Sequence, residues 1–149
     1  MKRRRAGQAV VEFALVAPVF FLLLLGVIEA GRFILYYETL NNATREGARY
    51  AIVHGSNSFC PSGPMPPGMT APACHDPTGD NVVQRVRDSG FGLLGTGVVV
   101  DQANMWQPIG NGRGSNVTVA ASYTYQSIVP LVPLPPITVT AESTLVINN

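Results

Sequence analysis

Residues 7–28 read GQAVVEFALVAPVFFLLLLGVI, and this apolar run decides where the rest of the chain can lie. No charged side chain occurs from residue 13 to residue 28, and residues 9–11 extend the run to about the 20 residues with which a helix crosses a bilayer. Four cations precede it at residues 2–5, and cationic flanks stay on the cytoplasmic side. We therefore predict a transmembrane helix over residues 8–31, with the rest of the chain outside the cytoplasm.

Glu12 is the one charged residue inside the run. A carboxylate at the edge of a membrane helix costs a few kcal/mol on insertion scales, so we expect it to be protonated, drawn to the interface or paired with a cation. One interpretation is that it reaches the lipid headgroups and needs no partner. A second interpretation uses its spacing, because Glu12 stands five positions after Gly7, which itself follows the basic leader.

This spacing resembles the class III signal of type IV pilin-like proteins, which a membrane prepilin peptidase cuts after the glycine. The resemblance implies that residues 1–7 are a cleaved leader, with the cut between Gly7 and Gln8. It also implies that Glu12 pairs with a subunit's freed N-terminal amine during assembly. Two alternatives stay open: a secretory signal peptide cut near Glu29 or Ala30, and an uncleaved membrane anchor.

The helical pattern continues past the membrane face. Apolar and small residues recur at steps of three and four, namely Phe33, Tyr36, Tyr37, Leu40, Thr44, Gly47, Ala48 and Ala51. Polar residues take the other side, so we predict one helix over residues 8–53, roughly 70 Å long, whose second half packs on an external domain. Pro18 predicts a kink in the membrane half. Gly26 and Ala30 form a small-xxx-small pair that would let another helix approach closely.

Three short elements stand out along this helix: GQAVVEFAL at residues 7–15, EAGR at 29–32 and REGAR at 45–49. Their order and spacing resemble the TadE-like family of pseudopilins. The resemblance implies a minor pilin-like component of the tight-adherence apparatus, which builds adhesive type IVc pili from the bacterial inner membrane. The implied partners are a prepilin peptidase, other pilins and pseudopilins, the inner-membrane assembly platform and membrane lipid.

The charged residues of these elements have two interpretations. Glu29 and Arg32 stand where the helix leaves the membrane, which suits contact with an assembly partner. Ion pairing along the helix at three- or four-residue spacing, or simple solvation, explains them equally well. The same holds for the charged residues of the third element, Arg45, Glu46 and Arg49, which flank Gly47.

The composition allows one membrane helix and one small external domain over residues 54–149. The chain has 149 residues, of which 46% are hydrophobic and 13% charged. Without residues 1–7, six Lys and Arg remain against nine Asp and Glu, so no basic surface is left for nucleic acid. No catalytic motif is present, and we predict no enzyme activity, cofactor, metal or small-molecule substrate. The alternative function is an anchored binding or adhesion domain that does not polymerise.

Residues 55–79 are rich in proline, glycine and serine, which predicts a long exposed loop. Cys60 and Cys74 lie within it, outside the cytoplasm, and we predict a disulfide between them. On the loop-entropy model it would stabilise the fold by about 3 kcal/mol. A metal site that adds His54 or His75 is the alternative, but the cysteines lack the usual CxxC spacing.

The remaining pattern predicts an α+β domain. We expect a helix over residues 81–94, N-capped by Asp80, and strands over 97–102, 115–126 and 137–147. Their alternation predicts an antiparallel sheet of three to four strands, with one face covered by the two helices and one face wet. Residues 128–136, IVPLVPLPP, predict a stiff apolar connection. Trp106 is expected to cap the end of the sheet, and Asp76 and Asp80 to flank a solvated turn.

Overall fold

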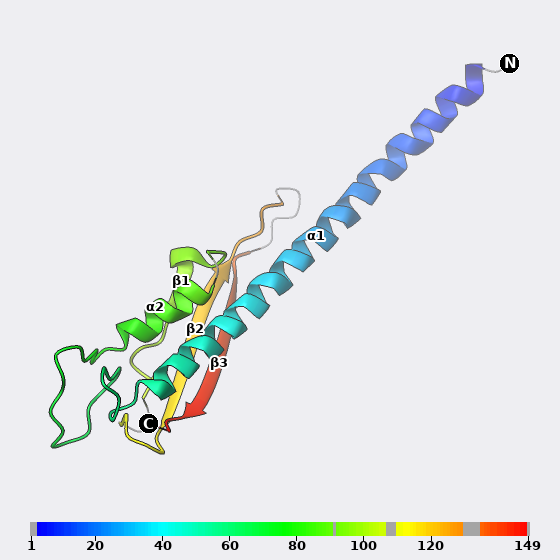
Figure 1. The fold of residues 1–149 in the computed structure, drawn as a ribbon. Helices are drawn as coiled ribbons and strands as arrows, with labels where there is room; N and C mark the ends of the chain where they lie inside the picture. Colours follow the sequence, from blue (N-terminus) through cyan, green and yellow to red (C-terminus); the bar gives the residue numbers. More distant parts are fainter. Residues whose placement is uncertain (1–2, 91, 107–109, 130–134, 149) are drawn as a thin grey trace.

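The computed structural model describes residues 3–90, 92–106, 110–129 and 135–148. The elements in chain order are the helices α1 (Arg3–Val53) and α2 (Asp80–Ser89), a short 3-10 turn (Gly95–Gly97), and the strands β1 (Val98–Val100), β2 (Asn116–Tyr125) and β3 (Ile137–Val146). The N-terminal half of α1 stands free, while its C-terminal half lies against the other elements (Figure 1). The predicted α+β class, with a long N-terminal helix, a second helix and an antiparallel sheet, is confirmed.

Helix α1 is continuous for 51 residues, about 75 Å at 1.5 Å per residue, and Pro18 lies inside it without ending it. Its first half exposes large apolar side chains on all sides, and Phe13 is 71% exposed. Its second half buries one stripe, in which Leu40 is 0% exposed. Tyr37, predicted on that stripe, is instead 43% exposed, because it lies at the margin of the groove that α1 forms with β3.

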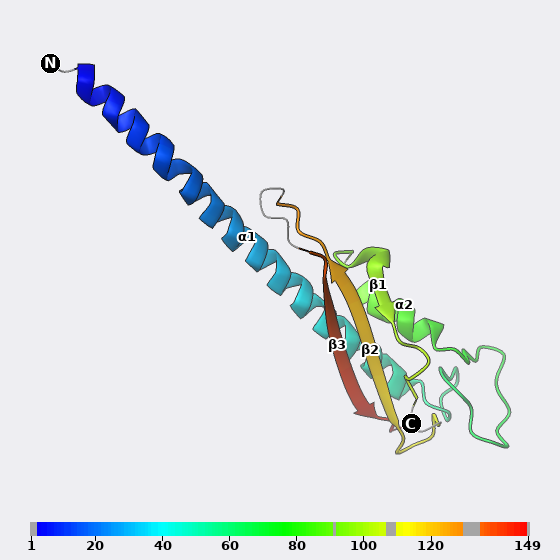
Figure 2. The same ribbon diagram turned by 180° about the vertical axis from the view of Figure 1, so that it is seen from behind.

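The three strands form an antiparallel sheet in the order β1-β2-β3. Alternate side chains point toward α1 and are buried, namely Val117, Val119, Ala121, Tyr125, Val139 and Ala141. Helix α1 crosses this face, and the opposite face is open (Figure 2). The predicted alternation of covered and wet faces is therefore correct. Strand β1 is shorter than expected at both ends, because a 3-10 turn occupies the residues before Val98 and the chain leaves the strand after Val100 and turns from residue 103.

Helix α2 packs mainly on α1 rather than directly on the sheet. Gly47 makes the close approach possible, since a Cβ at this position would lie 2.5 Å from Cγ2 of Val86 and 3.4 Å from Cγ1 of Val119. The helix ends at Ser89, before the predicted residue 94, and Gly90 follows it. Gly47 thus lies between the second helix and the sheet.

The start of α2 corrects one prediction, because Asp80 is not the N-cap. Gly79 holds the cap position with φ of 79°, and Asp80 is the first helical residue. The carboxylate of Asp76 takes the capping role and accepts hydrogen bonds from the backbone N–H groups of Gly79, Asp80 and Asn81 at 2.8–3.0 Å. Asp76 is nearly buried, so the predicted solvated turn is a structured helix start.

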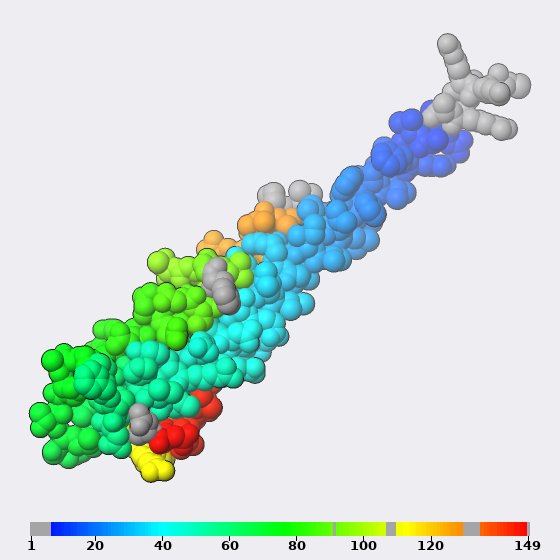
Figure 3. Space-filling model, in the orientation of Figure 1, coloured from blue at the N-terminus to red at the C-terminus, as the bar shows by residue number. Residues whose placement is uncertain are grey.

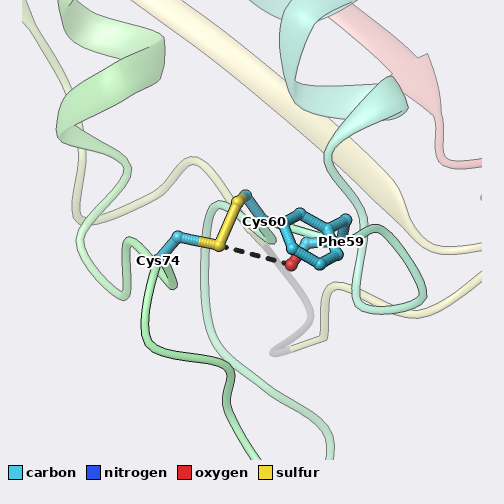
Figure 4. Close-up of a disulfide and its surroundings, with 3 residues drawn as sticks. All are labelled: Phe59, Cys60 and Cys74. Carbon is cyan, nitrogen blue, oxygen red and sulfur yellow. Dashed lines mark hydrogen bonds between the residues drawn. A yellow bond between two sulfur atoms is a disulfide. The ribbon is translucent and has the colours of Figure 1, made fainter.

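The loop over residues 55–79 is irregular, but its base is buried. Pro61 and Ser62 are buried, and Ser62 forms an isolated parallel bridge with Asp76. The predicted disulfide between Cys60 and Cys74 is present, two residues before the bridge on each strand of the loop, with the two Cα atoms 5.2 Å apart (Figure 4). Backbone hydrogen bonds hold the two ends of the loop in the domain, while much of the rest is exposed, including Phe59 at 90%.

Trp106 packs against this loop base rather than over the end of the sheet. Its indole lies so close to Gly63 and Gly79 that a Cβ at either position would come within 2.4 Å of a ring atom. Both glycines also have positive φ angles, so each is fixed by conformation and by space. Of the predicted apolar connection over residues 128–136, residues 130–134 lie outside the described residues.

Candidate functional site

The residues predicted to act in processing and docking lie at two places on α1. Gly7, Gln8 and Glu12 are near its free N-terminal end, and Glu29 and Arg32 are where hydrogen bonds and an ion pair join the α+β domain to the helix. About three turns of exposed apolar helix separate Glu12 from the nearest part of the domain, at Leu25. The structure therefore keeps these groups apart.

The N-terminal group is open on all sides. Gln8 Nε2 donates a hydrogen bond to Glu12 Oε1 at 3.2 Å, so both side chains lie on one face of the helix. No atom lies within 4 Å of a Cβ built at Gly7. Cleavage between Gly7 and Gln8, and the pairing of Glu12 with an amine, stay predictions.

Glu29 is buried, at 7% exposure, by partners from its own chain. The Tyr125 hydroxyl donates to Glu29 Oε1 at 2.6 Å, the backbone N–H of Ile128 donates to the same oxygen at 3.3 Å, and Arg32 Nη1 lies 3.1 Å from Glu29 Oε2. We call Glu29, Arg32, Tyr125 and Ile128 the Glu29 cluster. It joins the helix to the end of β2, about a hundred residues later in the chain.

Aromatic rings pack around this cluster. Phe33 meets Tyr125 edge to face at 5.5 Å, and Tyr36 stacks on Tyr123 at 5.2 Å. Burial raises the pKa of Tyr125 to about 12, and its hydrogen bond to the Glu29 carboxylate acts in the same direction. The hydroxyl therefore stays protonated at physiological pH and can donate to Glu29.

Sequence reasoning predicted Glu29 and Arg32 but missed Tyr125 as their partner. The ion pair along the helix, one of the two interpretations of these residues, is present. Tyr125 lies within the strand predicted over residues 115–126, but no local spacing connects it to Glu29. One feature of the sequence could have indicated this partner. Tyr125 is the last inward-facing side chain of its strand, and the hydroxyl of a tyrosine at such a position can reach a buried carboxylate on the covering helix.

Gly26 and Ala30 line an apolar groove between α1 and the segment after β2. Its other walls include Leu25, Phe33 and Ile137, and its volume is about 260 Å³. Space is open around Gly26, where no atom lies within 4 Å of a built Cβ. The small-residue pair is therefore accessible at the level of the Glu29 cluster.

The REGAR element divides into two buried small residues, Gly47 and Ala48, and three charged residues that reach the surface. Gly47 lies under α2, as described above. Arg45, Glu46 and Arg49 line a groove of about 510 Å³ between α1 and α2, together with Asn42, Arg85, Asp88 and Ser89. Glu46 pairs loosely with Arg49 at 3.8 Å and with Arg85 at 4.0 Å.

The alternative metal site does not form around the cysteines, which are bonded to each other. His54 Nδ1 lies 2.8 Å from Tyr50 O, and His75 Nε2 lies 2.8 Å from Gly63 O, so both rings are engaged by the backbone. Across the described ranges, no three His, Cys, Asp or Glu residues gather as they would around a metal ion.

Together these features define a class of protein: a small α+β domain fixed to the outer half of a long helix whose inner half has the length and apolar character of a membrane anchor. A family model described as TadE-like protein matches residues 7–49, so this segment of the chain is similar to TadE-like proteins. The resemblance predicted from the three elements is confirmed. This family is structural and pilus-associated, and the match suggests a protein related to the Tad pilus. No curated protein and no solved structure matched the chain.

Proposed function

We propose that the chain is a pilin-like structural subunit that takes part in assembly of a tight-adherence type IVc pilus. It is held in the bacterial inner membrane with its N-terminus inside, and a prepilin peptidase cuts it between Gly7 and Gln8. One observation carries the proposal: the family match falls on a helix whose large apolar side chains at residues 10–24 are exposed, and this run contains one acid, Glu12.

The exposed half of α1 explains why such a subunit has two states. A fully exposed apolar helix is stable only in lipid or against other apolar surfaces. Before assembly the bilayer surrounds it, and in a filament the helices of neighbouring subunits do so. Gly26 and Ala30 allow a neighbouring helix to come close, since space is open beside Gly26.

Glu12 supplies the polar contact in this scheme. A lone carboxylate among exposed apolar side chains favours a cationic partner, and cleavage after Gly7 creates an ammonium group at Gln8. A neighbouring subunit's new amine is then the group that Glu12 neutralises. Glu29 and Arg32 act less directly, because they hold the external domain in one position on the helix and so present neighbours with a fixed surface.

Mass spectrometry of the membrane-bound protein, with and without a prepilin peptidase, tests the processing step. We expect the mass of residues 1–7 to be lost only when the peptidase is present. Gly7→Val should keep the leader, because the proposed signal is cut after a glycine. The added side chain meets open space in the helix, so the fold should not change. An unchanged mass in both samples would contradict the proposal.

Glu12→Leu tests the docking step. The change should make membrane insertion easier by a few kcal/mol, while the amount of assembled filament falls sharply. Val11→Leu is the matched control, since it alters the neighbouring exposed position without changing charge. An anchored domain that never polymerises would tolerate both changes equally.

A further inference from the structure

We propose that the external domains of adjacent copies dock side by side, with a basic groove on the helical side of one copy against an acidic row on the open sheet face of the next. The inference rests on the proposed function and names the surfaces through which the subunits meet outside the membrane. It follows from the charges of two grooves, their height above the membrane and their positions on opposite sides of the domain.

The first surface is the groove between α1 and α2, which we call the arginine groove. Arg45, Arg49 and Arg85 line it together with Glu46 and Asp88, so its net charge is positive. Arg49 and Arg85 share the carboxylate of Glu46 at 3.8 and 4.0 Å, and the Arg49 side chain is 73% exposed. Within the part of the chain that the structure describes, Arg45 forms no ion pair. The space-filling view shows α1 and α2 side by side on this face (Figure 3).

The second surface is a shallow groove of about 370 Å³ on the open face of the sheet, which we call the acidic row. Glu142 is the register partner of Ala120, and the backbone N–H of Asp101 donates to the carbonyl of Ala120 at 2.9 Å. The two exposed carboxylates thus stand on either side of Ala120. The side chains between them are small, which leaves room for long arginine side chains. Among the described residues, neither carboxylate has a cationic partner, and Asp101 accepts hydrogen bonds only from Asn104.

The two surfaces lie at the same height above the membrane. Gly47 faces Val119, and Arg45 and Arg49 flank Gly47 on α1. On the sheet, Ala120 and the acidic row come directly after Val119. A neighbour displaced sideways in the same membrane, without sliding along the helix axis, would therefore bring its acidic row opposite the arginine groove.

The two surfaces also face opposite ways, because the helices form one layer of the domain and the sheet forms the other (Figures 1 and 2). Contact between unlike faces keeps all α1 helices parallel and leaves a free groove and a free row at the two ends of the assembly. Such head-to-tail contacts repeat without closing into a dimer. A dimer of like faces would instead bring arginine against arginine, which costs free energy.

Site-specific cross-linking in native membranes tests this contact. Two differently tagged full-length copies are expressed together with the peptidase, one carrying Arg45→Cys and the other Glu142→Cys, and a short bis-maleimide is added. We expect a cross-linked dimer that contains both tags, and at most traces from either variant expressed alone. A dimer of two Glu142→Cys copies, or a cross-link to a different protein only, would overturn the inference.

Charge reversal provides the second arm. A second cross-link between neighbouring domains, which uses neither this cysteine pair nor lysine side chains, serves as the readout. Glu142→Arg or Arg45→Glu should lower its yield by about tenfold, equivalent to about 1.4 kcal/mol. Both changes in one chain should restore most of that yield. Glu38→Arg is the matched control, because it makes the same charge change at an exposed position of α1 outside the arginine groove.

The N-terminal mass, measured on the same samples, separates the two proposals. If the leader is removed and filaments form, but reversal and restoration have no effect, the docking surfaces are wrong and the pilin-like function stands. If the leader is retained and no self-association occurs, both proposals fail.

Discussion

The inner and outer halves of α1 belong to one uninterrupted helix but meet different surroundings. In the inner half, residues 10–28, large apolar side chains point outward in every direction. In the outer half, Leu40, Ala43, Ala48 and Ala51 are completely buried, and the charged residues occupy the other side. The inner half depends on surroundings supplied from outside the chain, whereas the outer half finds its apolar surroundings within its own domain.

The largest difference in stability is expected when the same substitution is made in each half of α1. Leu40→Ala removes a side chain that is 0% exposed and should destabilise the domain by about 2–5 kcal/mol. Leu23→Ala, at a position that is 67% exposed in the inner half, should leave unfolding of the domain unchanged. Urea unfolding in detergent, followed by near-ultraviolet circular dichroism, measures both. Equal losses in the free energy of unfolding would contradict the conclusion that only the C-terminal half of α1 is packed within the domain.

The glycines give the next largest contrast. Gly47→Ala places a methyl group 2.5 Å from Cγ2 of Val86 and should cost roughly 1–3 kcal/mol. Gly26→Ala meets open space and should leave stability unchanged or raise it by up to about 1 kcal/mol, because alanine favours a helix. The same unfolding measurement applies. A stable Gly47→Ala variant would mean that α2 shifts to make room.

The Glu29 cluster lies at the boundary between the halves, and Tyr125→Phe removes its central hydrogen bond. The loss should be about 1–3 kcal/mol, because a buried carboxylate loses a donor at 2.6 Å. Amide hydrogen exchange at Ile128, whose N–H also meets Glu29, should quicken. Tyr37→Phe removes an exposed hydroxyl and is the matched control.

The same tyrosine predicts an alkaline limit. The pKa of Tyr125 is raised to about 12 in the folded protein, from an ordinary value of 10.0. Its contribution to stability is therefore complete below pH 10 and is lost as the pH rises from 10 toward 12. The Tyr125→Phe variant should lack this part of the alkaline loss, and a variant with the same alkaline profile as the native chain would contradict the assignment.

The smallest effect is expected at the start of α2, in the α+β domain. Hydrogen bonds from Thr78 and Gln102, at 2.8 and 2.9 Å, lower the pKa of Asp80 below its ordinary value of 3.8. The stability that they supply is present above pH 3.8 and is lost as the pH falls through the lowered pKa. Asp80→Asn should flatten this acid limb slightly in a pH series of thermal melts. If the loss of stability at acid pH is the same in the variant, other carboxylates cause that loss.

The sequence predicted the features that depend on periodicity. The helix through residue 53, the alternation in β2 and β3 and the disulfide all follow from local spacing and topology. Features that depend on long-range contacts were missed or misplaced. Asp76 caps α2 from across a turn, Trp106 fills the space above two loop glycines, and Tyr125 meets Glu29 from 96 positions away. No spacing rule connects such residues, because the fold alone brings them together.

The Glu29 cluster also sets how motion passes along the molecule. The sheet is joined to α1 at the level of Glu29 and packs against the helix as far as residue 51. We therefore expect the domain and the N-terminal half of α1 to move as one rigid body. From Glu29 to Val53 the helix measures about 36 Å. An anchor leaning by about 20°, an ordinary angle for a membrane helix, would swing the far end sideways by roughly 12 Å. Small changes in the packing of the anchors would thus be magnified at the disulfide-bearing loop.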